Sequence, residues 1–138
     1  MEASDIFLLV LAVPGLLISL WFTLVTYGIL PADARAVPQF CRMDDRSCAS
    51  ILHTPQARVF RIAPNAVFGT AWYGIVIAVS LVSLSPLMMD IAVTASWLTV
   101  LLSAWLAWSL RFRLRTHCPL CYTSHLLNLG IALTLSLR

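Results

Sequence analysis

The chain is organised around the stretch HCPLCYTSH at residues 117–125. This stretch holds a C-x-x-C pair, Cys118 and Cys121, with a proline inside it, and the apolar run 126–137 follows it. Cysteines three positions apart lie on one face of a helix and can close a small disulfide ring. The free backbone N–H groups at a helix N-terminus favour the thiolate form. A dithiol placed where an apolar helix leaves the water suggests electron transfer between aqueous thiols and a compound dissolved in lipid.

The composition is typical of an integral membrane protein. Of the 138 residues, 60% are hydrophobic and only 11% are charged, and the mean hydropathy is +0.89. An average soluble domain carries about 25% charged residues. The net charge of +3 comes from nine arginines against six acidic residues, because the sequence contains no lysine. We expect a lipid bilayer and no nucleic acid as partner, since no basic stripe with interleaved aromatic residues lies on a soluble scaffold.

Four apolar segments predict four membrane-spanning helices, at about residues 6–30, 66–85, 87–110 and 118–137. The first is too long for the core of a signal peptide, and no basic segment precedes it. It is long enough to cross a bilayer with some tilt. The predicted fold is all-α: one domain over residues 1–138, which forms an integral membrane four-helix bundle with a long cysteine-bearing loop between its first two spans.

The loop at residues 31–64 is the only sizeable polar stretch of the chain. It holds five arginines, three acidic residues, four prolines and the first two cysteines, Cys41 and Cys48. In its second half, His53–Ile62, apolar residues alternate with arginines, which suggests a short amphipathic helix on the membrane surface.

The order of the predicted spans places all four cysteines on one side of the membrane. With four crossings, the 31–64 loop and the 111–117 connection emerge on the same side. A disulfide relay from the loop pair to the C-x-x-C pair then becomes possible. Thiol–disulfide exchange requires direct attack of one sulfur on another, so physical reach is the condition.

Three motifs occur along the chain: the pair Cys41-x6-Cys48, the sequence PNAVFG at residues 64–69 that opens the second span, and CPLC at residues 118–121 that opens the fourth. Together with the four-span layout, they resemble the vitamin K epoxide reductase family, including its bacterial and archaeal thiol:quinone oxidoreductases. The resemblance covers nearly the whole chain. A C-x-x-C pair alone is a weak signal, whereas this combination is specific.

The resemblance implies a membrane thiol:quinone oxidoreductase. Such an enzyme reoxidises a thioredoxin-like partner, reduces a membrane quinone (ubiquinone, menaquinone or a related compound) and supports disulfide-bond formation. The resemblance further implies that Cys41 and Cys48 take electrons from the partner and that Cys48 attacks Cys118. Cys121, deeper in the bundle, would face the quinone ring and deliver electrons to it.

The resemblance also implies two quinone-binding residues. Asn65, in the PNAVFG motif, would donate a hydrogen bond to a quinone carbonyl. The family member that acts on vitamin K has a tyrosine four residues after the second active-site cysteine, and this sequence has His125 there. A histidine can still donate to a carbonyl oxygen, but the difference leaves the identity of the quinone open.

Each candidate has a structural alternative. Asn65 could cap the second helix. His125 shares a helix face with Cys121 and should point into the bundle, where it could bond a backbone carbonyl. Asn128 lies on the same face and could link two helices. Trp72 and Tyr73 could line a quinone pocket or pack as ordinary aromatic core residues.

Two structural interpretations of the four cysteines compete with catalysis: a structural disulfide and a zinc site. A zinc site is disfavoured, because x6 and x2 spacings match a zinc ribbon poorly and no further ligand cluster accompanies them. We therefore expect no metal. The alternative function is a non-catalytic membrane thiol protein, such as a soft-metal carrier or an assembly subunit.

The charge pattern and the family resemblance disagree about orientation. Eight of the nine arginines lie on the cysteine-bearing side, and only Arg138 lies on the other. The positive-inside rule would place the cysteines in the cytoplasm. The family usually works on the extracytoplasmic face, where disulfides persist. We expect a multi-pass protein of the cell membrane with its active site on the extracytoplasmic face, and the inverted, cytoplasmic orientation is the alternative.

Overall fold

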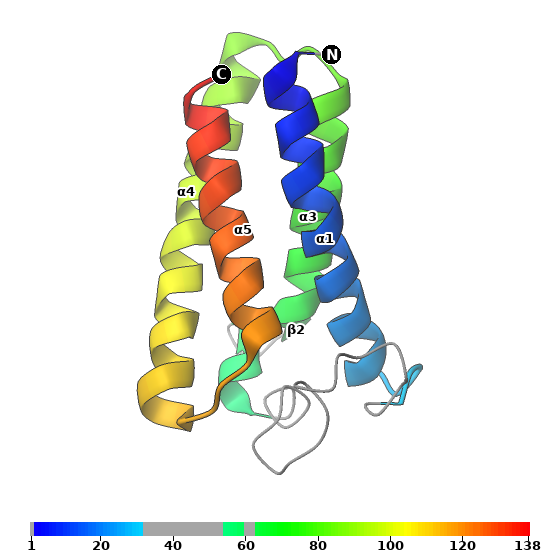
Figure 1. The fold of residues 1–138 in the computed structure, drawn as a ribbon, viewed down its shortest axis with the longest axis vertical. Helices are drawn as coiled ribbons and strands as arrows, with labels where there is room; N and C mark the ends of the chain where they lie inside the picture. Colours follow the sequence, from blue (N-terminus) through cyan, green and yellow to red (C-terminus); the bar gives the residue numbers. More distant parts are fainter. Residues whose placement is uncertain (1, 32–53, 60–62) are drawn as a thin grey trace.

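The computed structural model describes residues 2–31, 54–59 and 63–138, and within them four long helices lie side by side (Figure 1). These helices are α1 (Ala3–Thr26), α3 (Asn65–Leu81), α4 (Pro86–Trp108) and α5 (Pro119–Ser136). The two chain ends lie together at one end of the bundle, and the start of α5 lies at the opposite end (Figure 1). The predicted all-α four-helix architecture is confirmed.

The first helix begins and ends earlier than the segment 6–30 that hydropathy predicts. The backbone N–H of Glu2 donates to Oδ2 of Asp5 at 2.8 Å, so Asp5 closes the first helical turn and belongs to the helix. At the other end, Gly28 adopts a φ of +71°. Glycine takes this left-handed conformation without steric cost, and helices commonly end beside such a residue.

The helices pack as a chain of neighbours and not as a closed ring. α1 packs against both α3 and α5, and α5 packs against α4. By contrast, α3 and α4 share almost no contacts, although only the short turn 82–85 joins them. The backbones of α3 and α4 therefore approach each other less closely than those of the other neighbouring helices.

The close approach of α1 and α3 depends on a glycine. A Cβ atom at Gly15 would overlap the ring of Tyr73, which is buried. Across the same interface, the hydroxyl oxygens of Thr23 and Thr70 lie 3.2 Å apart. Small residues of this kind let membrane helices pack at short distance.

The outside of the bundle is apolar. Within the described residues, α1 and the segment Pro86–Leu114 are long and apolar enough to cross a bilayer, and only 28% and 11% of their most apolar windows are buried. A core helix of a soluble protein would be largely buried, so this exposure indicates contact with lipid. The shorter α3 is also apolar. The four crossings and their boundaries stay a prediction.

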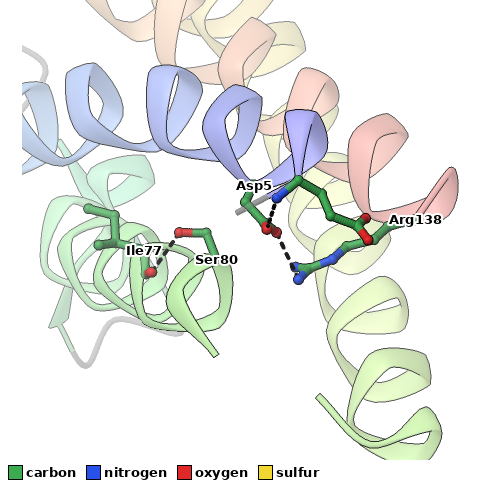
Figure 2. Close-up of polar contacts among 5 residues, drawn as sticks. Asp5, Ile77, Ser80 and Arg138 are labelled. Carbon is green, nitrogen blue, oxygen red and sulfur yellow. Dashed lines mark hydrogen bonds and ion pairs between the residues drawn. The ribbon is translucent and has the colours of Figure 1, made fainter. Parts of the chain in front are cut away.

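An ion pair joins the chain ends on the side of the bundle away from α5's first turn. Arg138 Nη2 lies 2.8 Å from Oδ1 of Asp5, and both side chains are largely buried. Figure 2 shows this pair, with Ser80 nearby donating to the carbonyl of Ile77 in its own helix. The one arginine that the sequence places on this side of the membrane is thus neutralised.

The described part of the segment before α3 is not helical as expected. Pro55–Ala57 form a short 3-10 turn, η2, and strand β1 (Arg58–Val59) pairs antiparallel with β2 (Ala63–Pro64). The expectation of an amphipathic helix over His53–Ile62 is therefore wrong for residues 58–59, and residues 55–57 form only a single 3-10 turn. A β-branched residue such as Val59 favours the extended strand, and this ladder leads the chain directly into α3.

A π-helical turn, η3 (Ser109–Leu114), extends α4 beyond the predicted boundary at residue 110. Arg115, at φ +50°, then reverses the chain towards α5. Ser109 and Leu110 are both buried, with 1% and 5% of their surfaces exposed. A π-turn shifts the register of the helix, so two successive side chains can face inward, and such turns are frequent at functional sites.

Candidate active site

The C-x-x-C pair forms a disulfide at the N-terminus of α5. The Cα atoms of Cys118 and Cys121 lie 5.2 Å apart. Cys118 is the N-cap residue, and its Sγ accepts a hydrogen bond from the backbone N–H of Cys121 at 3.3 Å. Pro119 occupies the first helical position, where a missing N–H costs nothing. The helix start expected from the sequence is confirmed.

The two sulfurs have different surroundings. Cys118 is fully buried and packs with Phe22 of α1 and Leu110 of η3. Cys121 is only partly buried and lines a cavity inside the bundle. One cysteine of the pair therefore faces the cavity, and the other lies beneath a layer of packed side chains.

The cavity has a volume of about 210 Å³ and lies between α3, α4 and α5, with α1 contributing at one side. Its wall is mostly apolar. The lining residues are Ser19, Phe22, Ala57, Pro64, Asn65, Ala66, Phe68, Gly69, Trp72, Tyr73, Thr99, Leu102, Ser103, Leu106, Ser109, Leu110, Leu114, Cys121, Ser124, His125 and Asn128.

Several polar atoms of the wall are buried without a hydrogen-bond partner among the residues that the structure describes. They are Nε1 of Trp72, Oγ of Ser109, both ring nitrogens of His125 and Oδ1 of Asn128. Buried polar groups in proteins nearly always have a partner. A mostly apolar cavity with a few such groups is typical of a small-molecule site.

The structure brings three of the predicted catalytic and quinone-binding residues to this one cavity. Cys121 and His125 lie on successive turns of α5, on the same face of the helix, and Asn65 is the first residue of α3. The expectation that His125 points into the bundle beside the dithiol is confirmed. Pro64 takes the N-cap position of α3, so Asn65 is the first helical residue and not the N-cap that the sequence suggested.

The sequence left two roles open for Trp72 and Tyr73, lining a pocket or packing in the core. Both residues line the cavity and also pack in the core. Trp72 lines the cavity, and its ring nitrogen has no hydrogen-bond partner within residues 2–31, 54–59 and 63–138. Tyr73 also lines it, but its hydroxyl donates to the backbone carbonyl of Ser124 at 3.0 Å. Tyr73 thereby holds α3 against the helix that carries the dithiol.

The sequence analysis missed the hydroxyl residues that α4 and η3 contribute. Thr99 and Ser103 of α4 and Ser109 of η3 line the cavity. A signal for this face does exist in the sequence, because Ser96 and Ser103 lie seven positions apart among large apolar residues, and they are the buried residues of α4. Small polar residues at this spacing mark the inward face of a helix whose other faces contact lipid.

The loop cysteines, Cys41 and Cys48, lie outside the described residues, so their placement relative to the C-x-x-C pair stays a prediction. Over residues 2–31, 54–59 and 63–138, no group of three or more His, Cys, Asp or Glu side chains lies close enough to hold a metal ion.

A comparison with models of protein families matches residues 6–136 to the vitamin K epoxide reductase family. The match covers the four helices and the segment between α1 and α3. A search of the curated proteins finds no match. The family match implies a membrane oxidoreductase that works between thiols and a quinone.

Proposed function

We propose that this chain, which belongs to the vitamin K epoxide reductase family, reoxidises a thioredoxin-like protein and reduces a membrane quinone, and so supports disulfide-bond formation. The observation that carries the proposal is the cavity wall. Cys121 of a redox-capable disulfide, His125 and Asn65 all line one apolar cavity.

The cavity suits a quinone ring in size and chemistry. An engineered cavity of about 150 Å³ in another protein takes up benzene, so a cavity of about 210 Å³ has room for a substituted six-membered ring. Quinone oxygens only accept hydrogen bonds. The amide of Asn65 and the imidazole of His125 can both donate, which fits the two binding roles that the family resemblance implies.

The loose packing of α3 and α4 suits a substrate dissolved in lipid. The cavity is lined by Phe68 of α3 and by Leu102 and Leu106 of α4, on the side where these helices do not pack together. A quinone with an apolar tail would place its ring in the cavity and leave the tail in the bilayer. No passage through water would be required.

The electron balance is that of a dithiol and a two-electron acceptor. With Cys118 and Cys121 reduced, two S–H bonds break and one S–S bond forms. Two electrons and two protons pass to the quinone, which becomes a hydroquinone with two O–H bonds. The position of Cys121 in the cavity wall supports its role as the sulfur that faces the ring.

The disulfide must then be reduced again by electrons from the partner. We assign this step to Cys41 and Cys48, with Cys48 attacking Cys118 as the family resemblance implies. Because Cys118 is fully buried against Phe22 and Leu110, the attack requires the local packing at the start of α5 to open. Thiol–disulfide exchange has no route that avoids direct contact of the sulfurs.

We propose that the dithiol end of the bundle faces the extracytoplasmic side, where oxidised thiols persist. The arginines 111, 113 and 115 lie at this end, and the positive-inside rule favours the opposite orientation. Labelling of a single cysteine introduced into the exposed turn 82–85, with an impermeant reagent in intact cells, tests the proposal. Labelling of that turn from outside the cell would contradict it.

The function is tested with purified protein in lipid nanodiscs, supplied with dithiothreitol or a reduced thioredoxin-like protein and a short-chain ubiquinone or menaquinone. We expect quinone reduction, which is measured as the loss of quinone absorbance. One quinone should be reduced for each pair of thiols oxidised. Binding of soft metals without any quinone reduction would instead support the non-catalytic alternative.

A further inference from the structure

We propose that Asn128 and Ser103 form a further polar contact of the quinone cavity and hold the ring oxygen that lies away from the dithiol. The proposal rests on the proposed function. Asn128 Nδ2 donates to Oγ of Ser103 at 2.9 Å, across the interface of α5 and α4. Asn128 is 9% exposed and Ser103 is 5% exposed, and both line the cavity.

The unpaired oxygen of Asn128 points to a ligand. Its Oδ1 is buried and accepts no hydrogen bond from any residue in the described part of the chain. A side chain that only links two helices needs one hydrogen bond, and it gains nothing from a second polar atom buried in an apolar cavity. A ligand that donates to this oxygen would satisfy it.

The spacing along α5 matches one ring. Asn128 follows Cys121 by seven residues and therefore lies on the same helix face, about 10 Å further into the bundle. A quinone ring fits the distance between Cys121 and Asn128. The distance would be made up of the contact from the sulfur to the ring, the ring with its two opposed oxygens, and one hydrogen bond. A ring in contact with Cys121 would present its remote oxygen to Asn128.

The chemistry of an amide beside a hydroxyl suits a site that must bind two oxidation states. The remote oxygen is a carbonyl in the quinone and accepts a hydrogen bond. After two electrons and two protons have arrived, it is a hydroxyl and can also donate one. A residue that only donates, or only accepts, would lose its contact during the reaction.

The Asn128–Ser103 pair can serve both states. With Nδ2 donating to Ser103, as the structure has it, Oδ1 is available to accept from a hydroquinone hydroxyl. If the side-chain amide of Asn128 rotates so that its oxygen and nitrogen exchange positions, Ser103 donates to Oδ1, and Nδ2 donates to a quinone carbonyl. A serine hydroxyl can donate or accept, so the bond between the two residues survives the exchange.

The chain provides a matched control for a purely structural role. Trp97 Nε1 donates to Oγ of Ser136 at 3.0 Å, which is another side-chain hydrogen bond between α4 and α5. Neither residue lines the cavity. Ser136→Ala removes a link between the same two helices without touching the proposed contact.

The test compares Asn128→Leu, Ser103→Ala, the double variant and Ser136→Ala in nanodiscs. We expect Asn128→Leu to raise the KM for a short-chain ubiquinone, and its equilibrium Kd, about tenfold. The double variant should add little to this, because the residues act as one pair. Ser136→Ala should leave both constants unchanged. The rate at which dithiothreitol reduces the Cys118–Cys121 disulfide without quinone should be the same in all variants.

Each outcome decides between the two proposals. If the wild-type protein neither binds nor reduces a quinone, the proposed function is wrong, and the proposed Asn128–Ser103 contact with the quinone is wrong too. If the wild-type protein reduces quinone but Asn128→Leu has an unchanged KM and Kd, or Ser136→Ala raises them equally, only the contact is wrong. Where Asn128→Leu does not fold, Asn128→Ser, which shortens the side chain but keeps it polar, gives the same comparison.

Discussion

The hydroxyl of Tyr73 on α3 donates a hydrogen bond to the backbone carbonyl of Ser124 on α5, across 3.0 Å and 51 positions of the chain. Ser124 lies three residues after Cys121, in the next turn of the helix that carries the dithiol. The Tyr73 ring also covers Gly15 of α1 so closely that a Cβ atom there would overlap it. One buried side chain thus connects three helices beside the redox pair.

Tyr73→Phe should destabilise the bundle by about 1 kcal/mol, because it removes a buried hydrogen bond and leaves the ring in place. Thermal unfolding in detergent measures the change as a lower Tm. Tyr27→Phe is the control, since Tyr27 is exposed at the end of α1. Equal Tm values for the two variants would show that the Ser124 bond contributes nothing to stability.

Gly15→Ala and Gly74→Ala should change stability in opposite directions. At Gly15 the new methyl group meets the buried Tyr73 ring, and overpacking of this kind costs about 1–3 kcal/mol. At Gly74 a Cβ atom would meet nothing within 4 Å, so alanine should stabilise α3 by roughly 0.5–1 kcal/mol through its higher helix propensity. Thermal unfolding of both variants in the same detergent checks the signs. A neutral Gly15→Ala would mean that α1 and α3 can move apart without loss.

Cys121→Ser should abolish quinone reduction even with dithiothreitol as the electron donor, because no thiol then faces the cavity. The Kd for a short-chain quinone should stay near the wild-type value, since a serine fills nearly the same volume. Turnover is measured as loss of quinone absorbance, and binding is measured separately at equilibrium. Retained turnover in the purified variant would remove Cys121 from its assigned role.

Cys41→Ala should trap a mixed disulfide between Cys48 and Cys118 during turnover, because the thiol that resolves it is missing. The link would close a loop of roughly 70 residues and, in the chain-entropy model, stabilise the protein by at most about 4 kcal/mol, less where the membrane already restricts the unfolded chain. Peptide mapping should recover the two cysteines joined, and the trapped form should unfold at a higher temperature than the reduced protein. If peptide mapping under turnover found Cys118 joined only to Cys121 and never to Cys48, the relay would be contradicted.

Local features of the sequence determined the helical architecture. Runs of apolar residues long enough to cross a bilayer predict helices, because a backbone in lipid must satisfy its own hydrogen bonds. The start of α5 followed from Cys118-Pro119, since proline is favoured in the first turn of a helix and does not interrupt the helix at that position. The family match over residues 6–136 agrees with motifs that are visible in the chain itself. Each of these signals depends on neighbouring residues alone.

Hydropathy alone placed the boundaries less well. It missed the first turn of α1, because Asp5 is charged yet closes that turn with the backbone of Glu2. It also suggested a helix where residues 58–59 form a strand, because the partner Ala63–Pro64 that stabilises this strand comes later in the chain.

Only the tertiary structure decided which faces of the helices meet. The helices are apolar on nearly every side, so their sequences say little about their rotation around their own axes. Packing sets that rotation: it places Cys121 in the cavity wall and buries Cys118, and it brings Asn128 of α5 to Ser103 of α4. These contacts join residues far apart in the sequence, and close packing of the helices, as between Gly15 and Tyr73, brings them together.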